Sequence, residues 1–347
     1  MRIRTLFILS ACSFFFSSCG QEPKGVFLYI GKQDPKSIFT LDLSNKGLTE
    51  LPENIETLQN LSYLNISNNK ISKLPKSLLR LKNLSVFIAD NNLFGTIPAG
   101  LCEIQNLNDV SLQGNNIKEI SDELFKIESL EALNLSYNEI RAIPEKLFRM
   151  RKLSKISLSN NNIKFFNIPK DVNKEITSFF LGNNKIQSLP ASISNLQKLN
   201  YLDLQHNEID VLSDSLFKLT LLETLNLEGN KIYFLPKSML KLVNLQTLFL
   251  AENKLANLVG IYELPLLEML KIEKNVLQID FEKFKNKNVL KYISLSKSQL
   301  KNKNNMNKFY SLKEIRVHIK NYQTDDLEKV KPYFIDFSGQ FLVSFEN

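Results

Sequence analysis

Residues 61–83 read LSYLNISNNKISKLPKSLLRLKN, and this stretch decides the fold. Counted from Leu61 as offset 0, apolar residues fall at offsets 3, 5, 10 and 13, and an asparagine stands at offset 8. The template recurs along the chain, with nine successive steps of 23 residues from Ile38 to Leu245. Such regularity predicts a stack of equivalent repeats rather than one compact globular core.

The offsets predict what each repeat forms. Offsets 3 and 5 alternate, which places both side chains on one face of a short strand. Offsets 13, 17 and 20 have helical spacing, and a proline follows offset 13 in six repeats, where it suits the first turn of a helix. Ser121 and Ser213 take that place in two other repeats as expected helix N-caps. The repeats begin at Ile38, Leu61, Leu84, Leu107, Leu130, Leu153, Ile176, Leu199, Leu222, Leu245, Leu267 and Leu290, with a degenerate one at Leu312.

A single repeat cannot fold alone. Its apolar side chains contribute at most about 10–20 kcal/mol when fully buried, whereas ordering each of its residues costs about 1.5 kcal/mol. Neighbouring repeats must therefore stack and share a core, and their strands are expected to form a parallel sheet.

The asparagines at offset 8 form a predicted structural ladder. Each follows a strand, where the chain turns inward and leaves backbone groups without partners, and a side-chain amide offers both donors and an acceptor. These residues are Asn69, Asn92, Asn115, Asn138, Asn161, Asn184, Asn207, Asn230, Asn253 and Asn275.

Residues 38–320 resemble the leucine-rich repeat family in its 23-residue bacterial form, LxxLxLxxNxLxxLPxxLxxLxx. The resemblance implies an α/β repeat solenoid of about 12–13 repeats. The expected shape is a horseshoe with a parallel β-sheet on the concave face and short helices or 3-10 turns on the convex face. Residues 92–98 resemble a plant-type repeat, and residues 165–169 lack the Leu-Pro step. Lys46, Ser298 and Lys320 replace the asparagine in terminal repeats.

The two ends of the solenoid are expected to be capped. Residues 26–37 are interpreted as an N-terminal cap that begins with a strand over 26–30. Residues 321–347 are interpreted as a C-terminal cap in which apolar runs at 333–335 and 341–343 form a hairpin or a strand pair. A functional tail is the alternative for this last segment.

The first eighteen residues are interpreted as a signal peptide, because two arginines precede a short apolar run and small residues. Small residues before Cys19 resemble the lipobox of bacterial lipoproteins, although Phe16 stands where leucine is usual. The resemblance implies a lipid (palmitate or a similar acyl chain) on Cys19, a tether over 19–25, and export to the outer membrane with possible surface exposure. Cys12 is an alternative lipidation site, and an ordinary cleaved leader is another.

Composition and motifs argue against an enzyme. The chain has two histidines and a net charge of +8 without the clustering expected of a nucleic-acid binder. It has no phosphate-binding glycine loop, HExxH, CxxC pair or nucleophile elbow. Cys102 is interpreted as a buried small hydrophobic residue. No catalytic residue, cofactor or metal is expected, although His206 near Asp203 and Glu228 is the alternative for a metal.

A partner-binding face is predicted from the outward strand positions at offsets 2, 4 and 6. Most are small or polar, so large apolar side chains there indicate anchors for a partner. The predicted contact residues are Tyr63, Val86, Ile88, Phe180, Tyr201, Asp203, Glu228, Phe249, Met269 and Tyr292. We expect a monomer that binds a protein on a neutral-to-acidic concave face. Isolated exposed apolar residues without a role, and an assembly component of the envelope, are the alternatives.

Overall fold

A computed structural model of the chain describes residues 34–280, 283–284, 289–299, 314–320 and 340–346. The chain divides into two compact units. The described part of unit 1 is residues 34–117 and 121–130, and unit 2 comprises residues 118–120 and the described residues from 131 onward.

Unit 1 has four parallel strands in chain order, one from each repeat. Every strand residue pairs with the residue 23 positions later, as in Thr40↔Tyr63 and Tyr63↔Val86. The strands are β1 (Thr40–Asp42), β2 (Tyr63–Asn65), β3 (Val86–Ile88) and β4 (Asp109–Ser111), and the 3-10 turns are η1 (Pro35–Ser37), η2 (Glu53–Thr57), η3 (Lys76–Arg80), η4 (Ala99–Glu103) and η5 (Asp122–Lys126).

Unit 2 repeats this arrangement with more strands and a second, two-stranded sheet of β6 and β8. Its main sheet runs in the order β5-β7-β9-β10-β11-β12-β13-β14-β15-β16. The strands are β5 (Ala132–Asn134), β6 (Ala142–Ile143), β7 (Lys155–Ser157), β8 (Phe165–Phe166), β9 (Ser178–Phe180), β10 (Tyr201–Asp203), β11 (Thr224–Asn226), β12 (Thr247–Phe249), β13 (Met269–Lys271), β14 (Tyr292–Ser296), β15 (Glu314–Lys320) and β16 (Gln340–Glu346). The 3-10 turns are η6 (Glu145–Arg149), η7 (Ala191–Asn195), η8 (Leu216–Lys218), η9 (Lys237–Lys241), η10 (Ile261–Glu263) and η12 (Lys297–Gln299).

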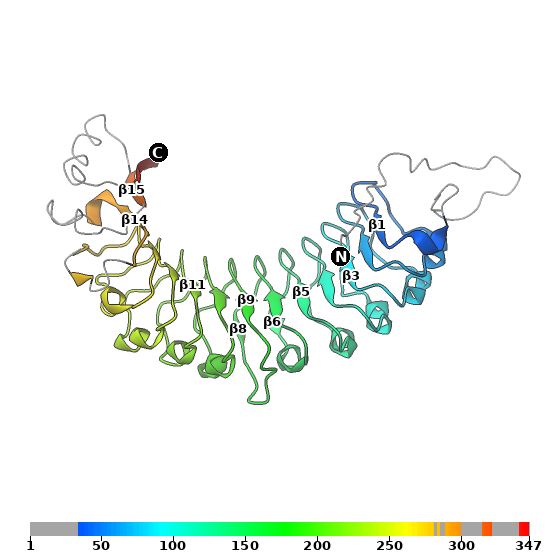
Figure 1. Ribbon diagram of the computed structural model, residues 1–347, viewed down its shortest axis with the longest axis horizontal. Coiled ribbons are helices and arrows are strands. Elements are labelled where there is room, and N and C mark those ends of the chain that lie inside the picture. The colour runs from blue at the N-terminus through cyan, green and yellow to red at the C-terminus, as the bar shows by residue number, and fades with distance from the viewer. Residues whose placement is uncertain (1–33, 281–282, 285–288, 300–313, 321–339, 347) are drawn as a thin grey trace, which may run out of the picture. The chain divides into compact units, whose positions relative to one another are not determined.

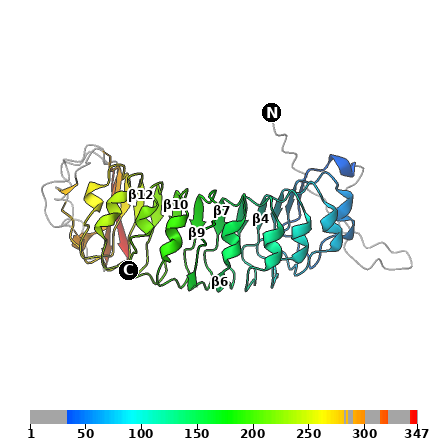
Figure 2. The same cartoon turned by 90° about the horizontal axis from the view of Figure 1, so that it is seen from below.

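In each unit the strands line one side of the coils and the 3-10 turns lie on the other (Figure 1). Figure 2 faces the side of the turns, which follow one another in chain order. The core lies between these two layers, and the template leucines fill it: Leu199, Leu202 and Leu204 are fully buried. The fold class expected from the sequence, a repeat solenoid with a parallel sheet and 3-10 turns on opposite sides, is confirmed.

The return segments are 3-10 turns of three to five residues rather than α-helices. The prolines precede these turns instead of opening them: Pro75 has extended torsions (φ −71°, ψ 149°), and its carbonyl accepts from the Leu78 N–H at 3.1 Å. The predicted proline position was therefore wrong by one residue. Ser121 makes no capping hydrogen bond, whereas the Ser213 hydroxyl accepts from the Ser215 N–H at 3.2 Å.

The offset-8 asparagines join each repeat to the one before it. The Asn207 Nδ2 donates to the Leu181 carbonyl of the preceding repeat (3.0 Å), and also to the Leu204 carbonyl of its own repeat (3.0 Å). Its Oδ1 accepts from the Ile186 N–H (3.0 Å). All ten ladder asparagines are buried.

Gln299 is a buried ladder residue that the sequence pattern did not identify. The template placed Ser298 at the asparagine position of that repeat, but the fully buried Gln299 donates from Nε2 to the Ile272 carbonyl at 2.7 Å. Its Oε1 accepts from the Ser296 N–H at 2.6 Å. The longer side chain of glutamine reaches the same kind of backbone groups from one position further along the chain.

The ends of the chain lie partly outside the described residues. The predicted signal peptide, Cys12, Cys19, the tether and the capping strand at 26–30 all lie outside them, as does the run at 333–335. Residues 340–346 form β16, which pairs in parallel with β15. This pairing makes the C-terminal run a further strand of the main sheet. No helix among the described residues is long and apolar enough to cross a membrane.

Candidate functional site

The outward side chains of the strands form one face in each unit, called here the strand face. It comprises the residues at offsets 2, 4 and 6 of each repeat. Because the strands are parallel and in register, residues at equal offsets form rows across neighbouring strands. These rows decide which of the predicted contact residues lie together.

In unit 1 the rows bring together Tyr63, Val86 and Ile88. Tyr63 pairs with Val86, and Ile88 lies in the adjacent row opposite Asn65. All three side chains are half-buried. Burial raises the pKa of the Tyr63 hydroxyl above its usual value, and the nearby carboxylates of Asp42, Asp109 and Asp90 add to this rise.

Beside this apolar cluster, one oxygen of the Asp90 carboxylate accepts two hydrogen bonds from the next repeat. The Ser111 hydroxyl donates to Asp90 Oδ1 at 2.5 Å, and the Gln113 N–H donates to the same oxygen at 2.9 Å. The strand face of unit 1 thus combines an apolar cluster with an internally bonded carboxylate.

In unit 2 one row runs Phe180, Asp203, Asn226, Phe249 and Lys271. Phe180 packs against Tyr201, with ring centroids 4.8 Å apart. At the other end of the row the Lys271 Nζ lies 4.6 Å from the Phe249 ring centroid. The row therefore places two polar residues between two aromatic groups.

The acidic residues of this face are more buried than outward positions suggest. Asp203 is 7% exposed and Glu273 is 8% exposed, although both occupy outward offsets of their repeats. Burial raises the pKa of Asp203 above its usual value, which the Gln205 N–H and His206 partly offset.

Glu228 lies near the same row, at offset 6 of the next repeat. Burial raises the pKa of its carboxyl group, Lys271 opposes this rise, and Glu273 and Glu252 reinforce it. Glu252 itself is different, because a hydrogen bond from Lys274 lowers its pKa; the two groups form an ion pair at 2.8 Å.

The remaining predicted contact residues, Met269 and Tyr292, pair with each other in β13 and β14 and are half-buried. The predicted residues thus fall into one cluster in unit 1 and two neighbouring groups in unit 2. Sequence reasoning missed Asn226, Lys271 and Gly182, although Asn226 and Lys271 share offset 4 with Phe180 and Phe249, a signal that could have found them.

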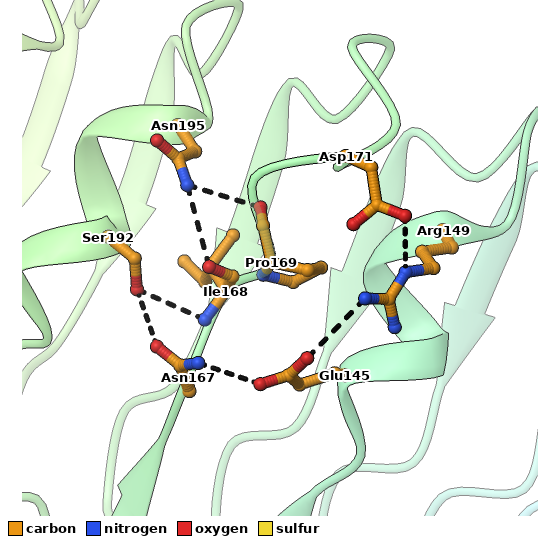
Figure 3. A network of polar contacts seen from close by, with 8 residues as sticks. All are labelled: Glu145, Arg149, Asn167, Ile168, Pro169, Asp171, Ser192 and Asn195. Atoms are coloured by element: carbon orange, nitrogen blue, oxygen red, sulfur yellow. Dashed lines mark hydrogen bonds and ion pairs between the residues drawn. The ribbon is translucent and has the colours of Figure 1, made fainter.

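The turn side of unit 2 carries a polar network with a structural role (Figure 3). The sixth repeat (153–175) has β8 but no 3-10 turn after it, and side chains of η6 and η7 hold its return segment. Asn167 donates to Glu145 at 2.7 Å and accepts from Ser192 at 2.8 Å. Asp171 forms an ion pair with Arg149 at 2.8 Å. The Arg149 side chain on this side is therefore paired.

The other residues singled out from the sequence form no reactive centre. Cys102 is half-buried; burial and a hydrogen bond to Glu123 raise the pKa of its thiol, which disfavours the nucleophilic thiolate. Within the part of the chain that the structure describes, no group of three His, Cys, Asp or Glu residues could hold a metal ion.

Comparison with known proteins supports this geometry. Sequence profiles described as leucine rich repeat match residues 105–163, 174–232 and 60–81. A comparison with curated proteins gives no match.

Solved structures resemble the chain over most of its length. A leucine-rich repeat protein of Leptospira interrogans is 25% identical, with a TM-score of 0.56, covering 90% of this chain and 84% of that one. An internalin of Listeria monocytogenes is 21% identical, with a TM-score of 0.69, covering 90% and 88%. The plant peptide hormone receptor RGFR1, solved in complex with RGF2, is 24% identical, with a TM-score of 0.62, covering 86% and 53%.

Leucine-rich repeat proteins are generally protein-binding scaffolds, and these comparisons indicate no enzyme family. The 23-residue template, the parallel strand rows and the matches to profiles and structures agree with one another. The chain has the leucine-rich repeat solenoid fold, and its residues 60–81, 105–163 and 174–232 match the leucine-rich repeat family.

Proposed function

We propose that this protein is an exported bacterial lipoprotein that binds a protein partner through its strand face. One observation carries the binding half of the proposal: half-buried aromatic side chains gather on an otherwise polar strand face in unit 2. Large aromatic groups with a polar surround are typical of the residues that dominate protein–protein binding energy. The plant receptor in complex with RGF2 supports the use of such a scaffold for polypeptide ligands.

The binding proposal is tested with a partner captured by the purified protein and then prepared in pure form. The variants Tyr201→Ala and Phe249→Ala are combined, because both side chains lie on the strand face while the core leucines remain intact. We expect the double variant to weaken binding of the purified partner at least tenfold, measured by titration calorimetry. Exposed Tyr233, which is outside the strand face, supplies the control Tyr233→Ala. Unchanged affinity of the double variant contradicts the proposal.

The lipid anchor rests on the sequence around Cys19. In this proposal the Cys19 thiol carries the acyl chains, and several chains anchor a protein durably because each buried methylene contributes about 0.8 kcal/mol. Metabolic labelling with palmitate is expected to mark the full chain, and Cys19→Ser is expected to abolish the label and release the protein into the aqueous phase. Cys12→Ser is the matched control, and loss of label in that variant instead would move the anchor to Cys12.

Surface exposure is the remaining part of the proposal. Protease treatment of intact cells is expected to remove the protein. Persistence of the full-length protein after such treatment, with digestion after the cells are broken open, would place it inside the envelope and favour an assembly role there.

A further inference from the structure

Unit 2 carries a group of acidic and polar side chains between aromatic ones, called here the acidic slot. We define it by Asp203, Asn226 and Glu228, with Phe180 on one side and Phe249 on the other. The strand register fixes this order, because Phe180, Asp203, Asn226 and Phe249 occupy one row on β9, β10, β11 and β12. The aromatic groups are therefore three strands apart, and polar groups occupy the two positions between them.

Asp203 is 7% exposed, and one of its two carboxylate oxygens accepts no hydrogen bond from the described residues. Its Oδ1 accepts from the Gln205 N–H at 3.1 Å, and no described residue donates a hydrogen bond to its Oδ2. No lysine or arginine in the described ranges lies within ion-pair distance of it. Gly182 lies beside this carboxylate, since a Cβ there would be 3.1 Å from Oδ2 and 2.8 Å from the Gln205 Cγ.

Glu228 adds a second carboxylate whose oxygens accept no hydrogen bond from the described residues. Its backbone N–H is used in the turn, where it donates to the Asn226 Oδ1 at 3.1 Å. The Asn226 Nδ2 donates to the Gln205 Oε1 at 3.1 Å, so the amides of the slot are satisfied within the protein. The groups of the slot with unused acceptor capacity are therefore its two carboxylates. Ionised carboxylates can only accept hydrogen bonds, and they favour cationic donors.

Unit 1 shows what a self-contained carboxylate looks like on the same face. Asp90 receives both a hydroxyl and a backbone N–H from the neighbouring repeat. Burying a charged group without such partners is costly, and a cation from outside would offset that cost. Asp203 is the more buried of the two carboxylates, yet its Oδ1 accepts one hydrogen bond where Asp90 Oδ1 accepts two, and this difference favours an external partner for Asp203.

The aromatic side chains limit which cation fits. Phe180 and Tyr201 form a packed pair, and Phe249 already accepts the Lys271 ammonium over its ring. A guanidinium group is planar, stacks on aromatic faces and forms two parallel hydrogen bonds with a carboxylate.

We propose that the acidic slot binds an arginine side chain of the protein partner, with the guanidinium against Asp203 and Glu228 and beside the aromatic rings. This inference rests on the proposed function, since it names the chemistry that the strand face recognises. It also identifies Asp203 and Glu228 as determinants of specificity, whereas the aromatic residues supply contact area.

The first experiment uses the full chain and a defined probe, the peptide acetyl-Gly-Gly-Arg-Gly-Gly-amide. Citrulline in place of arginine keeps the shape of the side chain but removes its charge. We expect the arginine peptide to shift the backbone amide NMR signals of Gln205 and Glu228, and the citrulline peptide to bind at least tenfold more weakly. Equal binding of the two peptides, or shifts confined to other repeats, would overturn the proposal.

The matched variants are Asp203→Asn and Asp42→Asn. Asp42 occupies the same offset and accepts the equivalent backbone hydrogen bond, from the Ser44 N–H at 2.8 Å, but it is exposed and lies in unit 1. Asparagine already makes this bond at Asn226, so Asp203→Asn is compatible with the fold. We expect Asp203→Asn combined with Glu228→Gln to weaken arginine-peptide binding at least tenfold, and Asp42→Asn to leave it unchanged.

The purified partner separates this inference from the proposed function. If the aromatic variants weaken partner binding and the two charge variants do not, the slot proposal is wrong while the strand-face function stands. If neither set of variants changes partner affinity, the strand-face function itself fails. Loss of affinity in both sets supports both.

Discussion

At the scale of single residues, the asparagine ladder carries the best-defined energetic role. Asn207 makes hydrogen bonds with the backbone of two repeats, and each of those backbone groups is buried from water. An alanine at this position leaves these groups unpaired, and each unpaired buried group costs about 1–3 kcal/mol.

We therefore expect Asn207→Ala to lower the free energy of unfolding by about 1–3 kcal/mol, measured by urea denaturation. Asn244→Ala serves as the control, because Asn244 makes one exposed hydrogen bond to the Thr220 carbonyl at 2.8 Å. A change below about 0.5 kcal/mol is expected for the control. Equal losses in the two variants would contradict the ladder role.

A second prediction concerns Asp203 and pH. Its pKa is raised in the folded protein, chiefly by burial, and the titratable groups that interact with it are Tyr201 and His206. An acid with a raised folded pKa destabilises the fold at pH values above that pKa, and this penalty disappears as the pH falls below the unfolded value. We expect Asp203→Asn to be more stable than the wild type at neutral pH and equal to it below pH 3.8, the ordinary pKa.

Glu252 provides the control of opposite sign. Its pKa is lowered by the hydrogen bond from Lys274, so Glu252→Gln is expected to reduce stability at neutral pH and to have no effect in acid. The free energy of unfolding of both variants is measured by denaturation from acid to neutral pH. If it changes relative to the wild type in the same direction for both variants, the opposite pKa shifts of Asp203 and Glu252 are refuted.

Part of this residue-scale chemistry follows from the sequence and part does not. The offsets placed Phe180, Asp203 and Phe249 on one face, because a strand alternates its side chains. They could not show that Asp203 is buried, since that depends on side chains from neighbouring repeats. The role of Gln299 could not be predicted for a related reason: its longer side chain reaches backbone groups from a position outside the template.

At the scale of elements, the turn after each strand needs a residue with positive φ. His206 occupies it in one repeat (φ 49°) and Gly229 in the next (φ 68°). A Cβ on Gly229 would collide with the His206 ring. The glycine therefore meets two needs: it adopts the positive φ of the turn, and it leaves room for the His206 ring of the preceding repeat.

We expect Gly229→Ala to destabilise the protein by more than the about 1–2 kcal/mol that the left-handed conformation alone costs an L-residue. Gly47→Ala is the matched control, because Gly47 has φ 69° and nothing lies within 4 Å of its added Cβ. Thermal denaturation measures the difference between the two variants. His206→Ala in the Gly229→Ala background should recover that difference, and no recovery would show that the collision is not the cause.

The return segments show where element-level inference from sequence stops. Helical spacing at offsets 13, 17 and 20 fits both a short α-helix and a 3-10 turn, because such short segments contain too few residues to distinguish the two periods. The sixth repeat (153–175) departs further, since it has no 3-10 turn after β8. Asn167 and Asp171 then bond to side chains of the flanking turns, and those long-range contacts are invisible in a single repeat.

At the scale of the whole molecule, no repeat has a core of its own. Leu225 is fully buried and stands in a row with Leu202 and Leu248 of the adjacent repeats. A cavity at Leu225 therefore weakens three repeats together, which is the behaviour expected when stability arises from repeats and their interfaces.

We expect Leu225→Ala to cost about 2–5 kcal/mol and to speed amide hydrogen exchange in β10 and β12 as well as in β11. Exchange in β1 to β4 should change little, because stability in stacked repeats depends mainly on nearest neighbours. The exposed Glu223 of the same repeat gives the control Glu223→Ala, for which no change is expected. Faster exchange confined to β11 would contradict the shared core.

The register of the strands has a consequence for how such a chain changes length over generations. Thr224 pairs with Thr247 after 23 residues, yet Thr247 pairs with Met269 after only 22, so the missing residue is absorbed away from the sheet. If a whole repeat is gained or lost, the next repeat still meets a neighbouring strand with the same pattern of backbone partners. Duplication or deletion of one repeat is thus compatible with the fold. A shift of one residue within a strand, in contrast, would turn its leucines outward. Over evolution, the strand face can therefore become longer or shorter by whole repeats while the packing of the core stays the same.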